Sequence, residues 1–259
     1  MRRPTVRLVI ALPVLVACGT SGNVPQTTPA PDLGKRFVAD NGIVSSAHPQ
    51  ASEAGVEMLR RGGNAVDAAV ATAFTLGVGE PQMSGLGGGG GMLVWLQREG
   101  RAEYIDFYRA QRVETWRGVE ALDSGVVSLR GVGVPGEVAG LLEAHERCGR
   151  LPRADVLAPA IRLAEEGFPV NQILADMIAS SADRRSGFPS SARLYLPGGE
   201  PLKPGDILRN PELATALRRV AAEGRSGFYE SETAREVVRV LNEWDHPATL
   251  ADFAAYPPQ

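Results

Sequence analysis

Six of the eight residues from Ser84 to Gly91 are glycines. Such a run either surrounds an anion with backbone N–H groups or lets two stretches of backbone approach closely. No Gly-Lys-Ser/Thr follows it, so it is not a phosphate-binding P-loop. A strand, and not a helix, is predicted after it, which argues against a dinucleotide-binding turn. We therefore expect close backbone packing beside a substrate pocket.

Two helices are predicted before this run. Apolar and small residues recur at helical spacing from Ala51 to Leu59, and Gly62-Gly63 ends that helix. Asn64 caps the next helix, with Asp67 in its first turn as a structural residue. A short strand, 43–47, is expected ahead of both. The predicted buried face of the second helix comprises Val66, Ala69, Val70, Ala73, Phe74 and Gly77.

After the glycine run the pattern predicts a hairpin. Its strands are 92–97 and 102–107, joined by the loop 98–101. The rest of the chain is predicted to be mainly helical, so that every expected strand lies in the first half. One of these helices begins after Asn210, at Pro211, and stops at Gly224. Other expected helix faces are Val138, Leu141, Leu142 and His145; Leu157, Ala160, Ile161 and Ala164; and Ala234, Val237, Val238 and Leu241.

The composition excludes several classes of function. The 259 residues are 44% hydrophobic with a formal net charge of −3, which indicates a globular protein. Basic residues are dispersed, so we expect no nucleic-acid partner. The two cysteines and three histidines are far apart in the sequence, so neither a metal site nor a disulfide framework is predicted, and no cofactor is expected. Cys148 is interpreted as a packed thiol.

The first eighteen residues are predicted to be a lipoprotein signal peptide. Arg2 and Arg3 precede an apolar run of about twelve residues, a helix of only ~18 Å against a hydrocarbon core of ~30 Å. The segment 15–19 resembles the bacterial lipobox, in which Cys18 is lipidated. The alternative is an ordinary signal peptide with an incidental cysteine. Residues 19–38 then form a flexible Pro/Thr-rich tether to a domain at 39–259, lipid-anchored at the periplasmic or extracellular face of the bacterial envelope.

Several motifs resemble the gamma-glutamyltransferase (glutathione hydrolase) family of N-terminal-nucleophile hydrolases, specifically its large-subunit half. The stretch 46–71 matches the helix–Gly-Gly-Asn-Ala-x-Asp-Ala–helix signature, and 84–90 matches the Ser-Gly-x-Gly-Gly-Gly-Gly loop. The resemblance covers about residues 40–256. It implies an α+β fold, the mostly helical N-terminal part of an αββα sandwich with a few strands. Later matches are Val134-Pro135-Gly136 with Gly140, Pro159-Ala160 with Ala164 and Gly167-Phe168, Phe228-Tyr229 with Ala234, and Thr249-x-x-Asp252-Phe253-Ala254-x-Tyr256.

The resemblance also implies a substrate-binding residue, Arg109. In the family an arginine just after the hairpin binds the α-carboxylate of the γ-glutamyl substrate, and a guanidinium fork suits that task. Gln111 stands where the family has proline, and the alternative is that Arg109 is a solvated residue at the hairpin end. The Ser84 hydroxyl either contacts a substrate carboxylate or closes a turn. Two further departures are Gly91, where the family usually has phenylalanine, and Ser231, where it usually has glycine.

No catalytic residue is expected in this chain. The family's nucleophile is a threonine that begins the small subunit, whereas the Thr27-Thr28 pair lies in the predicted tether. The expected function is therefore the large-subunit half of an enzyme that hydrolyses or transfers the γ-glutamyl group of glutathione-like amides, with a small-subunit partner chain. The alternatives are a non-catalytic envelope lipoprotein that uses the fold to bind a ligand or partner, and a fragment of another N-terminal-nucleophile amidase such as a β-lactam acylase.

Overall fold

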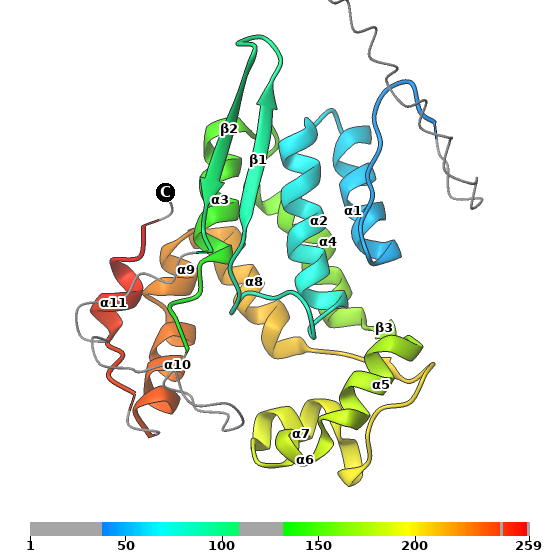
Figure 1. Cartoon of the computed structure of the whole chain (residues 1–259), viewed down its shortest axis with the longest axis vertical. Helices are drawn as coiled ribbons and strands as arrows, with labels where there is room; N and C mark the ends of the chain where they lie inside the picture. Colours follow the sequence, from blue (N-terminus) through cyan, green and yellow to red (C-terminus); the bar gives the residue numbers. More distant parts are fainter. Residues whose placement is uncertain (1–37, 109–131, 244–245, 258–259) are drawn as a thin grey trace, which may run out of the picture. The chain divides into compact units, whose positions relative to one another are not determined.

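The computed structural model describes residues 38–108, 132–243 and 246–257 (Figure 1). Cys18 and Arg109, like the predicted signal peptide and nearly all of the tether, lie outside the described residues. The chain divides into residues 1–39 and 40–259, and every described helix and strand lies in the second unit. Its longer helices are α1 (Pro49–Arg60), α2 (Ala65–Gly79), α3 (Glu137–Cys148), α4 (Arg153–Glu166), α5 (Gln172–Ser180), α8 (Pro211–Glu223) and α10 (Glu232–Glu243). Short helices are α6 (Ala182–Ser186), α7 (Pro189–Tyr195), the 3-10 turn η3 (Pro197–Gly199), α9 (Ser226–Tyr229) and α11 (Leu250–Ala254).

The first two helices form as predicted. After α1, Gly62 takes a left-handed φ of 86°, and the N–H of Gly63 donates to the carbonyl oxygen of Met58 over 3.0 Å. The two helices pack side by side, and a Cβ at position 55 would lie 2.4 Å from the Thr72 hydroxyl oxygen. Glycine at 55 is therefore required for this close approach.

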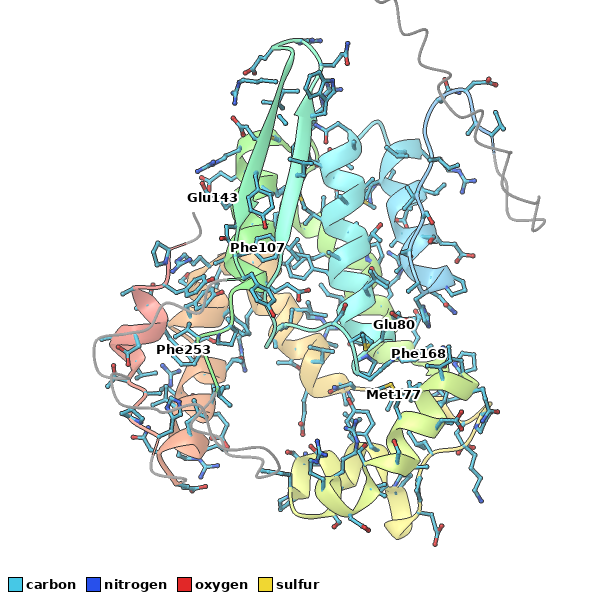
Figure 2. The ribbon with its side chains drawn as sticks, in the orientation of Figure 1. Glu80, Phe107, Glu143, Phe168, Met177 and Phe253 are labelled. Atoms are coloured by element: carbon cyan, nitrogen blue, oxygen red, sulfur yellow. The ribbon has the colours of Figure 1, made fainter. Side chains whose placement is uncertain are left out.

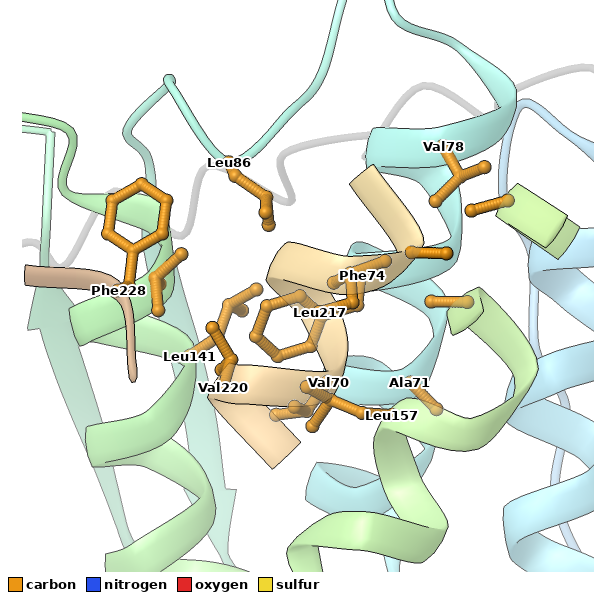
Figure 3. Close-up of a cluster of buried hydrophobic side chains, with 14 of the residues drawn as sticks. Val70, Ala71, Phe74, Val78, Leu86, Leu141, Leu157, Leu217, Val220 and Phe228 are labelled. Atoms are coloured by element: carbon orange, nitrogen blue, oxygen red, sulfur yellow. The ribbon is translucent and has the colours of Figure 1, made fainter. Parts of the chain in front are cut away.

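Helix α2 is more deeply buried than one amphipathic face predicts. It contacts α1, α3 and α4, and buried side chains lie around most of its circumference. The prediction was wrong for Ala69, which is exposed. Figure 3 shows Phe74 of α2 beside Leu217 of α8, in the core that also includes Leu157 of α4 and Leu141 of α3.

The predicted hairpin is confirmed within one residue. Strands β1 (Gly91–Leu96) and β2 (Arg101–Asp106) are antiparallel, with Gly91 paired to Asp106 and Leu96 paired to Arg101. One face of the hairpin packs on α3 and includes Ile105, which is fully buried. The opposite face is exposed and apolar, with exposed fractions of 71% for Leu93, 61% for Trp95 and 61% for Tyr104.

Two strand predictions were wrong. Residues 43–47 form no strand, and Ile43 is 61% exposed. The reason is physical: an extended segment becomes a strand only when another strand bonds to it, and none of the described residues does so. The prediction that every strand lies in the first half of the chain was also wrong. In the later half, β3 (Phe168–Pro169) pairs with β4 (Ile207–Leu208) to form a second small sheet. These two-residue strands are too short to give an alternating pattern.

The observed fold class is α+β, mostly helical with two two-stranded sheets among the described residues. Within the described ranges, no helix combines the length and the apolar character needed to cross a bilayer.

Candidate functional site

The candidate site lies at the end of β2, where the glycine loop 84–91, the start of α3 and Phe107 meet (Figure 2). Phe107 is 5% exposed, and Tyr108, the last described residue before the gap, is 77% exposed. Arg109 follows Tyr108 directly in the sequence. The backbone on which the predicted substrate-binding residue depends is therefore described, although Arg109 itself is not.

The glycine loop is held by its backbone on both sides. The N–H of Phe107 donates to Gly90 O over 2.9 Å, and Gly88 O accepts from the N–H groups of Gly136 (2.8 Å) and Glu137 (3.0 Å). A Cβ at position 89 would lie 2.6 Å from Phe107 O, so only glycine allows this approach. Close backbone packing, predicted from the glycine run, is confirmed.

Two glycines at the start of α3 leave the space that Phe107 occupies. A Cβ at Gly136 would lie 2.1 Å from Phe107 O, and one at Gly140 would lie 2.1 Å from ring carbons of Phe107. The two positions are one helical turn apart, so they face the same side. The Pro135-Gly136 and Gly140 motif thus provides the surface against which the end of β2 rests.

Two tyrosines from later motifs form hydrogen bonds with the start of α3 and with Phe107. The Tyr229 hydroxyl donates to Pro135 O over 2.6 Å and accepts from the N–H of Ala139 over 3.1 Å. The Tyr256 hydroxyl donates to Phe107 O over 3.1 Å. Their rings are stacked, with centroids 6.1 Å apart and planes at 4°. Motifs that are far apart in the sequence therefore converge on the backbone just before Arg109.

Glu137 is a site residue that the sequence analysis missed. It begins α3 and is 9% exposed. Burial raises the pKa of its carboxyl group to about 7, and a hydrogen bond from the Gly85 N–H opposes part of that shift. In the sequence it resembles any acidic residue in a helix's first turn. The available signal was its surroundings, Gly136, Ala139 and Gly140, whose small side chains indicate close packing on every side.

Other sequence-predicted residues have structural environments. Asp67 is completely buried, and its carboxylate accepts the N–H groups of Asn64, Arg150 and Leu151 over 2.8–3.2 Å. This confirms its structural role. Cys148 has a free, half-buried thiol whose pKa is raised by burial, as fits a packed residue. Ser84 is half-buried in the turn that precedes Gly85.

The three histidines do not form one cluster. The Nε2 atom of His145 lies 3.3 Å from the Asp67 carboxylate, His48 packs edge-on against Phe168, and the Nε2 atom of His246 lies 3.1 Å from Val132 O. Among the described residues, no group of three or more metal-ligating side chains is close enough to hold an ion.

Comparison with known proteins agrees with the motifs. A family model described as gamma-glutamyltranspeptidase matches residues 51–259. A glutathione hydrolase proenzyme of Bacillus subtilis (strain 168) is 35% identical over 233 residues, covering 87% of this chain. The chain spans 39% of the length of that relative.

Two solved structures resemble the fold. Helicobacter pylori gamma-glutamyltranspeptidase aligns with a TM-score of 0.78 and 29% identity over 86% of this chain and 66% of that chain. A cephalosporin acylase from Bacillus halodurans aligns with a TM-score of 0.76 and 31% identity over 91% of this chain and 46% of that chain.

Proposed function

Because this chain belongs to the gamma-glutamyltranspeptidase family, we propose that it is the large-subunit part of an enzyme acting on γ-glutamyl amides such as glutathione. Its α+β fold is the mostly helical first part of the N-terminal-nucleophile sandwich found in the similar solved structures. The observation that supports the proposal best is the convergence of three family motifs, the glycine loop, Gly136 with Gly140, and Tyr256, on Phe107. A fourth motif supports the second of these, because Tyr229 bonds to Pro135.

The proposed role of Arg109 is to bind the α-carboxylate of the γ-glutamyl group. A planar guanidinium can donate two parallel hydrogen bonds to a carboxylate, which fixes the orientation of the substrate as well as its affinity. Such a contact is effective only if its backbone is held still. Bonds from the glycine loop and Tyr256 hold Phe107, two residues before Arg109.

We propose that the nucleophilic threonine lies on the remainder of the enzyme. Its hydroxyl would attack the γ-carbonyl carbon while its own α-amino group takes the hydroxyl proton. That proton would pass to the amide nitrogen as the C–N bond breaks, so that the amine leaves and an acyl-enzyme remains. Water would then release glutamate, or an amine would accept the γ-glutamyl group. The chain's 39% share of its Bacillus subtilis relative supports this division of roles.

The exposed hairpin face supports the same division. Leu93, Trp95 and Tyr104 form a contiguous apolar surface because Leu93 is paired directly with Tyr104 and Trp95 is two residues along β1. Leaving such a surface in water is unfavourable. We propose that the remainder of the enzyme covers this face.

A reconstitution assay tests the proposal. The chain would be produced together with the coding region that supplies the complementary part, and turnover of a chromogenic γ-glutamyl anilide would be compared with a heat-killed control. We expect turnover that requires both parts. Binding of a γ-glutamyl compound without any turnover would favour the non-catalytic lipoprotein instead.

An acylase is the second candidate, because the Bacillus halodurans cephalosporin acylase matches the fold almost as well as the transpeptidase does. The same preparation would be given a cephalosporin carrying an acyl side chain. Preferential cleavage of that amide over the γ-glutamyl anilide would replace the transpeptidase proposal with the acylase one.

We also propose that Cys18 is lipidated and anchors the protein at the periplasmic or extracellular face of the bacterial envelope. The charged start, the short apolar run and the Leu-Val-Ala-Cys sequence support it. Replacing the sulfur nucleophile, Cys18→Ser, should move the protein from the membrane fraction to the soluble fraction. Retention in the membrane fraction would reject lipidation at this residue.

A further inference from the structure

Glu137 is attached to the glycine loop by both its main chain and its side chain. Its N–H donates to Gly88 O over 3.0 Å, and its carboxylate accepts from the N–H of Gly85. The N–H of Gly88 in turn donates to Gly85 O over 2.9 Å, which closes the turn 85–88. One residue therefore holds both ends of this turn.

The contact depends on the absence of side chains around the carboxyl group. A Cβ at Gly88 would lie 3.3 Å from Glu137 Oε2, and one at Gly77 of α2 would lie 3.8 Å from Oε1. The carboxyl group is thus enclosed between α2, the glycine loop and the start of α3. Within the described part of the chain, it has no recorded cationic partner.

An enclosed carboxylate without a cation is costly to ionise. This is why the pKa of Glu137 rises to about 7, so that its proton exchanges near neutral pH. The glycines that face it, Gly77, Gly85 and Gly88, bring no ionisable group. Among the described residues, Tyr229 is an ionisable neighbour of Glu137. Burial raises the pKa of Tyr229 far above neutrality, so Tyr229 stays uncharged over this range.

The glycine loop connects Glu137 to the end of β2, so a change in the position of the loop affects the candidate site. Gly89 and Gly90 pack on Phe107 and Tyr108, and Gly90 O accepts the Phe107 N–H. A shift of the turn 85–88 therefore alters the support of the backbone that leads to Arg109.

We propose that Glu137 is a proton-sensitive positioning residue that sets how firmly the glycine loop supports the end of β2. When protonated, its carboxyl group stays enclosed at little cost, still accepts the Gly85 N–H and keeps the turn 85–88 closed. When ionised, the enclosed charge has no cation beside it and is better stabilised by water, so the loop opens more readily. Its effect on the loop is independent of the proposed reaction, whereas its effect on substrate affinity rests on the proposed function.

Hydrogen exchange of the loop tests the first part without any substrate. The protein, as purified with any chain that accompanies it, would be studied between about pH 6 and about pH 8, with rates corrected for intrinsic exchange. We expect protection of the loop peptide to fall as pH rises, by on the order of ten-fold over this range, because ionisation of Glu137 favours the open loop. Peptides from α10, which packs on α9 and α11, should not change.

Glu137→Gln separates charge from shape. Its amide oxygen can still accept the Gly85 N–H, but it does not titrate, so loop protection should become independent of pH. The matched control is Glu143→Gln, which removes a carboxylate on the same helix that pairs with Arg147 over 2.6 Å at the surface. This control should keep the wild-type pH dependence.

Two results would overturn the proposal: wild-type loop protection that is flat across this range, or a pH dependence that survives in Glu137→Gln. If Glu137→Gln does not fold, the wild-type titration alone decides, because a step confined to the loop with a midpoint near neutrality is still required.

In the active complex, KM for the γ-glutamyl substrate should rise as pH rises through neutrality while kcat changes less, and Glu137→Gln should flatten the KM profile. If the loop responds to pH and no turnover is found, the proposed function fails and the positioning role stands.

Discussion

Asn64 and Asp67 each bind the other's backbone at the start of α2. The Asn64 side-chain oxygen accepts the Asp67 N–H over 3.1 Å, and the Asp67 carboxylate accepts the Asn64 N–H over 2.8 Å. The same carboxylate also accepts the N–H groups of Arg150 and Leu151 at the start of α4. A helix cap is thus also the joint between α2 and the α3–α4 connection.

Asp67→Ala should strongly destabilise the protein. It leaves three partly buried N–H groups without their acceptor, at about 1 kcal/mol each, so we expect a loss of about 3 kcal/mol in urea unfolding. Asp155→Ala is the matched control, since that half-exposed carboxylate pairs with Arg61 at the surface over 2.7 Å. The control should cost less than about 1 kcal/mol. Equal losses of stability for the two variants would contradict the conclusion that Asp67 joins α2 to the α3–α4 connection.

The pH dependence of stability should change in Glu137→Gln. The folded pKa of Glu137, about 7, lies above the ordinary value of 4.5, so between these values the folded state binds more protons than the unfolded state. The contribution of Glu137 to stability is therefore present below pH 4.5 and is lost as pH rises through 7. Relative to Glu137→Gln, the wild type should lose up to about 3 kcal/mol over this window. If the free energies of unfolding of the two proteins changed with pH in parallel, the raised pKa of Glu137 would be contradicted.

Tyr256→Phe should loosen the end of β2. Removing the hydroxyl leaves the buried Phe107 carbonyl without this donor, at a cost of about 1–3 kcal/mol. Thermal unfolding would show the loss, and exchange of the peptide that contains Phe107 should increase. Tyr195→Phe is the control, because its recorded contact with Arg185 is through the ring and survives the change. If Tyr195→Phe were as unstable as Tyr256→Phe, the loss could not be assigned to the hydrogen bond between the Tyr256 hydroxyl and Phe107 O.

Leu93→Glu should impair association with the complementary part of the enzyme. Leu93 is 71% exposed here, so the stability of this chain alone should hardly change. Burying a leucine is worth about 1.5–3 kcal/mol, so affinity for the complementary part should fall by on the order of ten- to a hundred-fold. Arg98→Glu, in the loop of the same hairpin, is the charge control. Unchanged binding by Leu93→Glu would show that another surface carries the interface.

Arg109→Ala should reduce kcat/KM for γ-glutamyl substrates in the active complex. A hydrogen bond to a charged group is worth roughly 1.5–3 kcal/mol, which corresponds to a loss on the order of ten- to a hundred-fold. Arg98→Ala removes another hairpin arginine and should leave kcat/KM unchanged. A wild-type value for Arg109→Ala would assign the α-carboxylate to a different residue.

Local signals predicted the local structure well. The cap at Asn210, the stops at Gly62 and Gly224, and the hairpin were all recoverable because each depends on a few neighbouring residues. The strand at 43–47 failed for the opposite reason, since pairing requires a partner that local sequence does not reveal.

The site was only partly predictable. Motif matches located the glycine loop and the start of α3, and the small residues beside Glu137 indicated close packing, but no local pattern showed what encloses its carboxyl group. Its burial comes from Gly77 on α2 and Gly88 in the loop, which tertiary packing brings together. The Tyr256–Phe107 hydrogen bond was likewise invisible, because it joins residues 149 positions apart.

That last separation has a consequence for how the protein is made. At about 5–20 residues per second, a ribosome needs roughly 7–30 seconds to travel from Phe107 to Tyr256. Throughout that interval the end of the nascent hairpin lacks its hydrogen bond from the Tyr256 hydroxyl. The backbone at Phe107 is therefore among the last parts of the described fold to be secured, and a pause or truncation late in synthesis would leave it without this hydrogen bond.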